Sequence, residues 1–266
     1  MLSYDSLIEQ AKSRGMPVTK IRGILREYLQ ILILKEIYRN EPGRKLYFTG
    51  GTYLRLAHNM KRFSEDLDFN TNKITKSAFE GLAEKVILEL KRSGINAKIR
   101  FSHWDNIYAS SLIFPEIEKD YNVISRYSKK QGIVIKIEVN KPGYKIKTET
   151  QAISGFGEVY PCLCTDISIM FADKIDALAK KKKARHIYDI IFMLSNKYPV
   201  DAKALQYLGI KKDPFEFISQ VIGNFSKPEL GRQAESLRPF LFDETDSDLI
   251  LNAHDIIPSL LEKYKT

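Results

Sequence analysis

Apolar residues recur every three or four positions over several stretches of the chain, and polar residues fill the positions between them. This spacing is typical of amphipathic helices, because 3.6 residues per turn bring such positions onto one face. It predicts helices over residues 3–14, 18–40 and 74–93. The same spacing continues from residue 166 to the C-terminus with prolines as interruptions, so this part is expected to be helical throughout.

Shorter runs rich in β-branched residues, several with a two-residue alternation, predict strands in the middle of the chain. The expected strands cover residues 45–49, 67–70, 97–101, 108–114, 133–139, 144–150 and 161–166. Strands followed by a long helical region indicate an α+β protein. We expect N-terminal helices (1–44) that pack on the core, an α/β core with a mixed sheet (45–165) and a helical C-terminal domain (166–266).

Two carboxylates alternate with two apolar residues at the strand expected at 67–70. Because residues two apart on a strand point to the same side, Asp66 and Asp68 share one face, and Leu67 and Phe69 share the other. Adjacent carboxylates repel each other, and a divalent cation removes the repulsion. Oxygen ligands of this kind suit Mg²⁺ bound together with a substrate phosphate. A solvated edge strand would carry the same residues, so the pair alone leaves both interpretations open.

The strand expected at 133–139 has the same two-sided layout. Its three isoleucines and Val139 cover one face, whereas Glu138 lies on the other. A sheet with one helix-covered face and one open face would bring Glu138 near Asp66 and Asp68. Three carboxylates can hold two metal ions for an in-line phosphoryl transfer. A solvated strand residue is the alternative interpretation of Glu138.

Gly50 and Gly51 lie between an expected strand and a short expected helix that Thr52 can cap. Glycine lets a ligand approach the backbone closely. The N–H groups and the positive dipole end at a helix N-terminus attract a phosphate. A plain tight turn would also use two glycines, but the spacing to the acidic segment favours a phosphate site, with Arg55 and Arg62 near the same cleft.

A lysine and an aspartate stand at apolar positions of two successive expected helices. Lys174 falls within an apolar stripe, and Asp189 is the only charge in the nearly all-apolar residues 187–194. A buried charge without a partner is very costly, so Lys174 either extends its ammonium group to solvent or meets a partner. One interpretation is a structural ion pair between Lys174 and Asp189 on neighbouring helices. The other is functional: Lys174 faces a triphosphate, and Asp189 orients it or moves a proton.

Composition narrows the class of protein. The 266 residues are 44% hydrophobic and 28% charged, which is typical of globular proteins and excludes a disordered, collagen-like or rod-shaped chain. No apolar stretch approaches the length of a membrane span, and the N-terminus does not resemble a secretory signal. Cys162 and Cys164 are expected to be buried thiols of a strand rather than metal ligands. A cytoplasmic protein without membrane association is therefore expected.

The chain carries 42 Lys and Arg against 33 Asp and Glu, and its net charge of +9 favours a polyanionic partner. Residues 174–185 hold six of the positive charges and one negative charge. A run of this kind usually ends a helix in solvent. Because it adjoins the expected site, we expect Lys181, Lys182, Lys183 and Arg185 to contact the phosphate backbone of an RNA.

Residues 50–55 (GGTYLR) and 62–69 (RFSEDLDF) resemble the signature of the AbiEii/MenT nucleotidyltransferase toxins. The strand with Glu138 and the helices with Lys174 and Asp189 are similar to later motifs of that family. The resemblance therefore extends from the first expected strand to the helix that contains Asp189.

The resemblance implies a polymerase-β-like nucleotidyltransferase core with a helical C-terminal region. It implies a toxin of type IV toxin–antitoxin and abortive-infection systems, with a nucleoside triphosphate (NTP) as substrate and Mg²⁺ or Mn²⁺ as cofactor. The implied acceptor is an RNA 3′ end, first of all the acceptor stem of tRNA, and the implied partner is a separately encoded antitoxin. The implied catalytic groups are Asp66, Asp68, Glu138, Lys174 and Asp189, of which Asp66, Asp68 and Glu138 bind metal, and the nucleotide contacts are Gly50, Gly51, Thr52, Arg55, Ser64 and Lys174.

Other activities stay open. A nucleotidyltransferase that modifies a small molecule or a protein would have the same core. The complete set of acids with Lys174 argues against a non-catalytic nucleotide- or RNA-binding module, and the Gly-Gly turn argues against a metal-dependent nuclease. His186 stands where the family often has an aspartate, and we interpret this as a variable position.

Overall fold

The computed structural model describes residues 1–123 and 132–265 of the chain. It divides into two compact units, Met1–Thr165 and Asp166–Thr266. Each unit buries apolar side chains of its own. The first unit contains all the strands of the described residues, and the second is built from helices.

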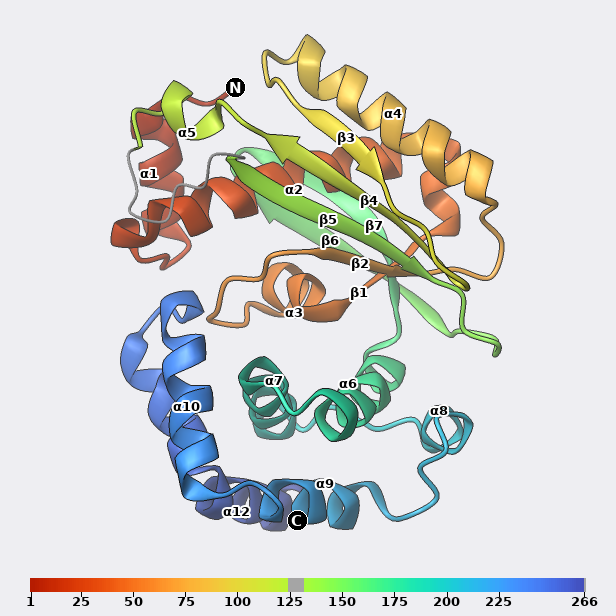
Figure 1. Cartoon of the computed structure of the whole chain (residues 1–266), viewed down its shortest axis with the longest axis vertical. Coiled ribbons are helices and arrows are strands. Elements are labelled where there is room, and N and C mark those ends of the chain that lie inside the picture. The colour runs from red at the N-terminus through yellow and green to blue at the C-terminus, as the bar shows by residue number, and fades with distance from the viewer. Residues whose placement is uncertain (124–131, 266) are drawn as a thin grey trace. The chain divides into compact units, whose positions relative to one another are not determined.

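Within the described residues of the first unit, seven strands form one mixed sheet in the order β3-β4-β5-β2-β1-β7-β6 (Figure 1). They are β1 (Tyr47–Thr49), β2 (Leu67–Asn70), β3 (Lys98–Phe101), β4 (Ile107–Phe114), β5 (Ile133–Asn140), β6 (Thr148–Gly155) and β7 (Glu158–Thr165). The pairs β2–β5 and β1–β7 are parallel, and the other neighbours are antiparallel. The two parallel pairs join strands that are far apart in the sequence, so β1, β2 and β5 meet at the centre.

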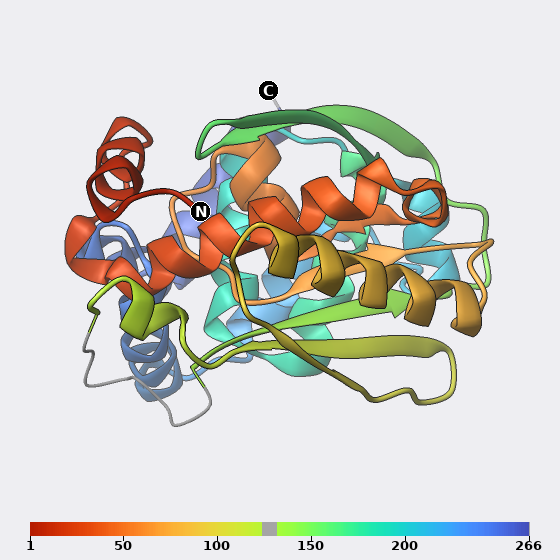
Figure 2. The same ribbon diagram turned by 90° about the horizontal axis from the view of Figure 1, so that it is seen from above.

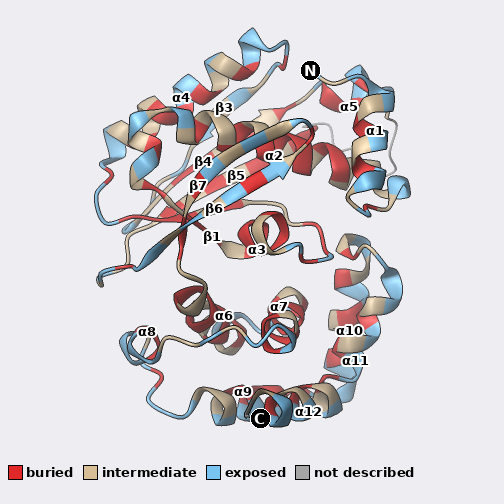
Figure 3. Ribbon diagram, turned by 180° about the vertical axis from the view of Figure 1, so that it is seen from behind, coloured by how far each residue is buried: buried red, intermediate tan, exposed pale blue. Residues whose placement is uncertain are grey.

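Two long helices cover one face of this sheet. The helices of the unit are α1 (Tyr4–Ser13), α2 (Ile21–Arg39), α3 (Gly50–His58), α4 (Lys76–Arg92) and α5 (Ile117–Asp120), with 3₁₀ turns at Val18–Lys20 and Glu41–Lys45. α2 and α4 lie side by side over the sheet (Figure 2), where α2 contacts β5, β6 and β7, and α4 contacts β3 and β4. α2 is buried along most of its length, whereas α4 keeps an exposed outer face (Figure 3).

The fold class predicted from the sequence is confirmed, with differences at particular elements. The strand expected at 144–150 begins later, and β6 forms a hairpin with a β7 that begins earlier than expected. The turn between them has positive φ at Phe156 (52°) and Gly157 (80°), as two-residue hairpin turns require. The short α5 had no counterpart among the expected elements.

The sheet interior holds the two cysteines of the chain. Cys162 and Cys164 of β7 are buried free thiols, which confirms the interpretation from the sequence. Burial raises the pKa of Cys164 to about 12, and the nearby Glu149 adds to this effect. Both thiols therefore remain protonated and unreactive at neutral pH.

The second unit is organised around one central helix. Its helices are α6 (Ile167–Lys181), α7 (Ala184–Ser195), α8 (Ala202–Tyr207), α9 (Pro214–Gly223), α10 (Lys227–Leu237), α11 (Asp248–Leu251) and α12 (Ala253–Lys265), with 3₁₀ turns at Arg238–Phe240 and Glu244–Ser247. α7 contacts α6, α10, α11 and α12 and is buried on nearly all sides, as its apolar sequence predicts.

Candidate active site

The acidic segment lies at the centre of the sheet, where β2 is held between β1 and β5. Leu67 and Phe69 are fully buried, and Phe69 packs on Phe48 of β1 with ring centroids 5.5 Å apart. Asp66 and Asp68 are half-buried. The expected alternation therefore holds: the apolar side chains anchor the strand, and the two carboxylates lie on the opposite side.

β5 places a third carboxylate beside this pair. β2 and β5 are parallel, and Glu138 lies opposite Asp68 in the register. Ile137 and Val139 are buried, so Glu138 lies on the other face of β5. Its carboxylate forms an ion pair with Lys136, which shares that face. The strand therefore brings a carboxylate and its own counter-ion to the acidic segment.

Carboxylate oxygens of this kind are the ligands that hard divalent cations take. Within residues 1–123 and 132–265, no three His, Cys, Asp or Glu side chains gather closely enough to hold a metal ion. The donor chemistry of Asp66 and Asp68 fits a cation held by one or two carboxylates together with waters and phosphate oxygens, as Mg²⁺ is. Glu138 as a metal ligand stays a prediction, because Lys136 neutralises its carboxylate here.

Two glycines pack directly against the acidic segment. Gly50 has a φ of 83°, in the left-handed region, and a Cβ on it would lie 2.3 Å from Oδ2 of Asp68. A Cβ on Gly51 would lie 2.7 Å from Nη2 of Arg62 and 2.9 Å from Oγ of Ser64. Gly50 therefore requires glycine, because its backbone is left-handed and the Asp68 side chain leaves no room for a Cβ. At Gly51 an added Cβ would meet the ends of the Arg62 and Ser64 side chains, which would have to shift. We call Gly50, Gly51, Arg62, Ser64 and Asp68 the turn cluster.

From the sequence, Thr52 was expected to cap the helix that follows. In the structure this helix, α3, begins earlier, at Gly50. Thr49 is its N-cap residue, and no side chain caps the first turn. Thr52 is fully buried, and its hydroxyl donates a hydrogen bond to the backbone carbonyl of Asp66. Its side chain holds the acidic segment in place. The first turn of α3 has no side-chain cap, so its backbone N–H groups are the kind that can bind an anion.

Arg55 was expected to lie beside the nucleotide. In the structure its side chain is buried in the core. Its side chain is 1% exposed, and Nε donates to Glu27 of α2 at 2.9 Å. Nη1 donates to the Met60 carbonyl at 3.1 Å and to Asn59 Oδ1 at 3.2 Å, and Nη2 donates to Glu27 Oε1 at 3.1 Å. A guanidinium can be buried here because a buried carboxylate neutralises it. Arg55 therefore joins α2 to α3.

α2 also holds the segment in front of the acidic strand, which no local sequence pattern indicates. Gln30 Nε2 donates to the carbonyl of Ser64 at 3.1 Å, although the two residues are 34 positions apart. Arg26 pairs with Glu65 at 3.0 Å. Burial lowers the pKa of Arg26, and the Glu65 charge partly offsets this. These contacts position Ser64 for its place in the turn cluster.

In the second unit, α6 and α7 are joined by an ion pair. Nζ of Lys174 lies 2.6 Å from Oδ2 of Asp189. Asp189 is fully buried, and the Lys174 side chain is 10% exposed. The ion pair that was one interpretation of these two charges is therefore present, and removal of either partner would leave an uncompensated charge. A catalytic role for the pair stays a prediction.

His186 lies one turn before Asp189 on α7, at 5% exposure. Both of its ring nitrogens are buried and lack a hydrogen-bond partner among the described residues. Burial lowers the pKa of His186 to about 3, with a further contribution from the Lys174 charge and opposition from Asp189. The imidazole is therefore neutral at physiological pH.

The basic run lies in the connection between α6 and α7. Lys181 ends α6, Lys182 is its left-handed cap with a φ of 45°, and Lys183 precedes α7. All three side chains are exposed, and Arg185 is half-buried. The run is therefore accessible to a ligand, as the expected contact with RNA requires.

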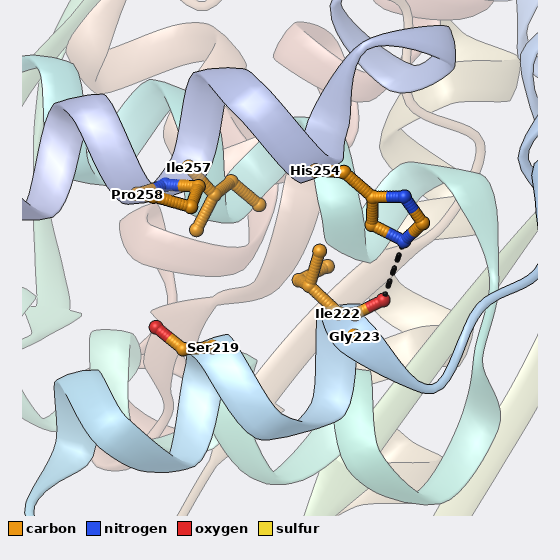
Figure 4. Close-up of a pocket in the computed structure, with 6 residues that line it drawn as sticks. All are labelled: Ser219, Ile222, Gly223, His254, Ile257 and Pro258. Atoms are coloured by element: carbon orange, nitrogen blue, oxygen red, sulfur yellow. Dashed lines mark hydrogen bonds between the residues drawn. The ribbon is translucent and has the colours of Figure 1, made fainter.

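A cavity of about 260 Å³ lies between α9 and α12 in the same unit (Figure 4). Its lining residues are Ser219, Ile222, Gly223, His254, Ile257 and Pro258. Nε2 of His254 lies 3.1 Å from the carbonyl oxygen of Ile222, within hydrogen-bonding distance. The lining contains none of the predicted site residues, so we do not include the cavity in the candidate active site.

A family model, described as the nucleotidyl transferase AbiEii toxin of type IV toxin–antitoxin systems, matches residues 32–255. The chain belongs to this family. The resemblance noted in the sequence is thereby confirmed, and the protein is a nucleotidyltransferase toxin of the type IV class. The matched region includes the turn cluster, both strands with carboxylates, and the Lys174–Asp189 pair.

The chain has the same fold as solved structures of other proteins. The AbiEii chain superposes on MenT4, a nucleotidyltransferase toxin from Mycobacterium tuberculosis H37Rv, with a TM-score of 0.59 at 14% identity, over 100% of this chain and 92% of that one. It superposes on JHP933 from Helicobacter pylori with a TM-score of 0.58 at 16% identity, over 91% and 93%. No protein of curated function matches the sequence. None of the helices in the described residues is long and apolar enough to cross a membrane.

Proposed function

We propose that this AbiEii toxin transfers a nucleoside monophosphate from an NTP to the 3′ end of an RNA, with the acceptor stem of tRNA as the expected substrate. The observation that carries the proposal is the turn cluster. Two glycines at an uncapped helix N-terminus pack against the acidic segment, Gly50 against Asp68 and Gly51 against the Arg62 guanidinium and the Ser64 hydroxyl. A carboxylate next to an anion-binding backbone is the combination that a metal-bound triphosphate requires.

Each of these residues has its own role in the proposed transfer. The triphosphate lies at the N-terminus of α3, where backbone N–H groups, Ser64 and Arg62 meet its negative charge. Asp66 and Asp68 would hold a divalent cation, Mg²⁺ or Mn²⁺, which would supply neutralisation of phosphate charge and a lower pKa for the attacking hydroxyl. The hydroxyl oxygen bonds to the α-phosphorus, the bond from that phosphorus to the bridging oxygen breaks, and pyrophosphate leaves. The hydroxyl proton passes to solvent.

The proposed partners follow from the family and the charge. Lys181, Lys182, Lys183 and Arg185 contact RNA phosphates, supported by their exposure and charge. A separately encoded antitoxin opposes the activity. The reaction takes place in the cytoplasm, where NTPs and tRNA are found, and the two free thiols fit a reducing compartment.

The test is transfer of label from each of the four NTPs in turn to total tRNA, in the presence of Mg²⁺. We expect one NTP to label RNA, with the added nucleotide found by sequencing of 3′ ends. Asp66→Ala removes a metal ligand and should lower the rate by about a hundredfold or more. It should also abolish the thermal stabilisation of the protein by NTP with Mg²⁺.

Glu84→Ala is the matched control, because Glu84 is an exposed carboxylate of α4 in the same unit. It should transfer at the wild-type rate. Equal transfer by Asp66→Ala and the wild type would contradict the assignment of the site. Label found on a protein or a small molecule instead of RNA would contradict the acceptor.

A further inference from the structure

The face of the sheet that carries Asp68 and Glu138 continues onto β4 and β3. Arg100 of β3 lies opposite Ser111 of β4, and Ser111 lies opposite Lys136 of β5. Cross-strand partners share a face, so the three side chains form one row. Lys98 lies on the same side of β3, and both it and Arg100 are exposed. Positive charge therefore extends outward from the carboxylates along this face.

Trp104 stands beside this row, in the turn between β3 and β4, where its backbone pairs with Ile107. It is the only tryptophan of the chain, and it is 42% exposed. Nζ of Lys136 lies 4.7 Å from the centre of its ring, and the same ammonium pairs with Glu138. Lys136 therefore links the indole to the carboxylate that lies in register with Asp68.

An exposed indole flanked by cations has the chemistry of a stacking platform for an unpaired nucleobase. Base stacking on an aromatic ring contributes about 1–3 kcal/mol per base and tolerates any sequence. The cations beside the ring bind the phosphates of the same strand. Lys136 is the cation at the ring, Arg100 lies in the same cross-strand row as Lys136, and Lys98 is two residues from Arg100 on β3.

The strand order indicates which substrate this platform serves. The glycines that bind the triphosphate follow β1, on one side of β2, whereas β5, β4 and β3 lie on the other side. In an in-line transfer, the attacking hydroxyl and the leaving pyrophosphate lie on opposite sides of the α-phosphorus. With the pyrophosphate on the glycine side, the acceptor approaches over β5, β4 and β3.

Building on the proposed transfer to RNA, we propose that Trp104, Lys136, Arg100 and Lys98 form a subsite that stacks an unpaired base at the 3′ end of the acceptor strand. We call these four residues the indole platform. It holds the strand so that its terminal hydroxyl points toward Asp68. The ligand class is single-stranded RNA, and a duplex with paired ends would not stack in this way.

The first test uses the single tryptophan of the intact protein as its own probe, without NTP and with EDTA. A short single-stranded RNA should quench the Trp104 emission in a saturable manner, and a blunt-ended RNA duplex should not. This measurement needs no catalysis, so Asp66→Ala should be quenched like the wild type. Equal quenching by the two RNAs, or none by the single strand, would overturn the platform even if transfer to RNA is established.

The second test separates the acceptor from the nucleotide. Trp104→Ala should weaken the binding of labelled single-stranded RNA by about fivefold to a hundredfold. It should raise the KM for the acceptor while the KM for NTP stays at the wild-type value, and Trp104→Phe should restore most of the affinity. Tyr207→Ala, at another exposed aromatic residue (57%) in the second unit, is the control and should bind as the wild type does.

Two further outcomes would contradict one of the proposals each. A rise in the KM for NTP alone would assign the indole to the base of the nucleotide and overturn the proposal. RNA that binds and quenches Trp104 without ever being extended would contradict the proposed function, while supporting a single-strand site on this face.

Discussion

Gly50 has a left-handed backbone, and its missing Cβ would fall 2.3 Å from the Asp68 carboxylate. Single atoms of this kind decide the geometry of the site. The sequence identifies both glycines and both aspartates because their roles depend on local spacing. It misplaces Arg55 and Thr52, because their partners, Glu27 and the backbone of Asp66, reach them only through the packing of α2 and the turn.

Gly50→Ala should disrupt the site locally. The added methyl group strains the backbone and displaces Asp68, at a cost of about 1–3 kcal/mol in the free energy of unfolding. We expect loss of the thermal stabilisation by NTP with Mg²⁺ and a fall in transfer of about a hundredfold. Differential scanning fluorimetry and the tRNA labelling assay measure the two effects.

Gly81→Ala provides the matched control for this substitution. Gly81 lies within α4, and a Cβ there would meet nothing within 4 Å. Alanine should stabilise the helix by roughly 0.5–1 kcal/mol and leave activity unchanged. Nucleotide binding by Gly50→Ala equal to that of Gly81→Ala would contradict the role given to the turn.

At the scale of elements, α6 and α7 are joined by a buried ion pair. The sequence indicates that each of the two charges needs a partner, because each stands at an apolar position. It does not predict the state of His186, which depends on how α7 is enclosed by its neighbouring helices. A position interpreted as variable thus holds a buried imidazole without hydrogen-bond partners among the described residues, beside Lys174 and Asp189.

The pKa of His186 makes the stability of this protein depend on pH. The folded state has a pKa of about 3, below the ordinary value of 6.5, so the unfolded chain takes up a proton first as the pH falls. Its contribution to stability is complete above pH 6.5 and is lost progressively toward pH 3. Between pH 7 and pH 5 the loss should be about 2 kcal/mol.

His186→Gln removes the titrating group and should reduce the pH dependence by that amount. Urea unfolding followed by far-UV circular dichroism at the two pH values measures the difference in the free energy of unfolding. The same loss of stability in the variant and in the wild type would show that His186 does not titrate as described.

At the scale of the whole molecule, the net charge of +9 is unevenly distributed. The 42 Lys and Arg divide into 27 in the first unit and 15 in the second, and the 33 Asp and Glu into 18 and 15. The first unit therefore carries the entire excess, and the basic run after α6 is balanced by acids elsewhere in the second unit. This distribution favours RNA contacts on both units: a local contact at the run, and the indole platform on the first unit.

Replacing Lys181, Lys182 and Lys183 by glutamine should weaken RNA binding and reduce its dependence on salt. Each phosphate contact contributes about 0.7 to 0.9 to the slope of log K against log salt, so the loss should reach about 2–3. Fluorescence anisotropy of labelled tRNA at several salt concentrations measures it. An unchanged slope would exclude the run as an RNA contact.

The control carries the same change of charge elsewhere in the second unit. Lys203, Lys211 and Lys212 are exposed, and their replacement by glutamine removes three positive charges outside the basic run. A comparable loss of slope in this control would show that net charge matters rather than the position of the lysines.

The sequence by itself determines which face of β2 and β5 carries carboxylates, that glycines form the turn before α3, and that Lys174 and Asp189 stand at apolar positions where a charge needs a partner. These properties follow from strand and helix periodicity and from the cost of burying a single charge. The tertiary structure alone decides that Asp68 lies in register with Glu138, that Arg55 is a core residue, and that Trp104 meets Lys136. Such contacts join residues tens of positions apart, and only chain packing brings them together.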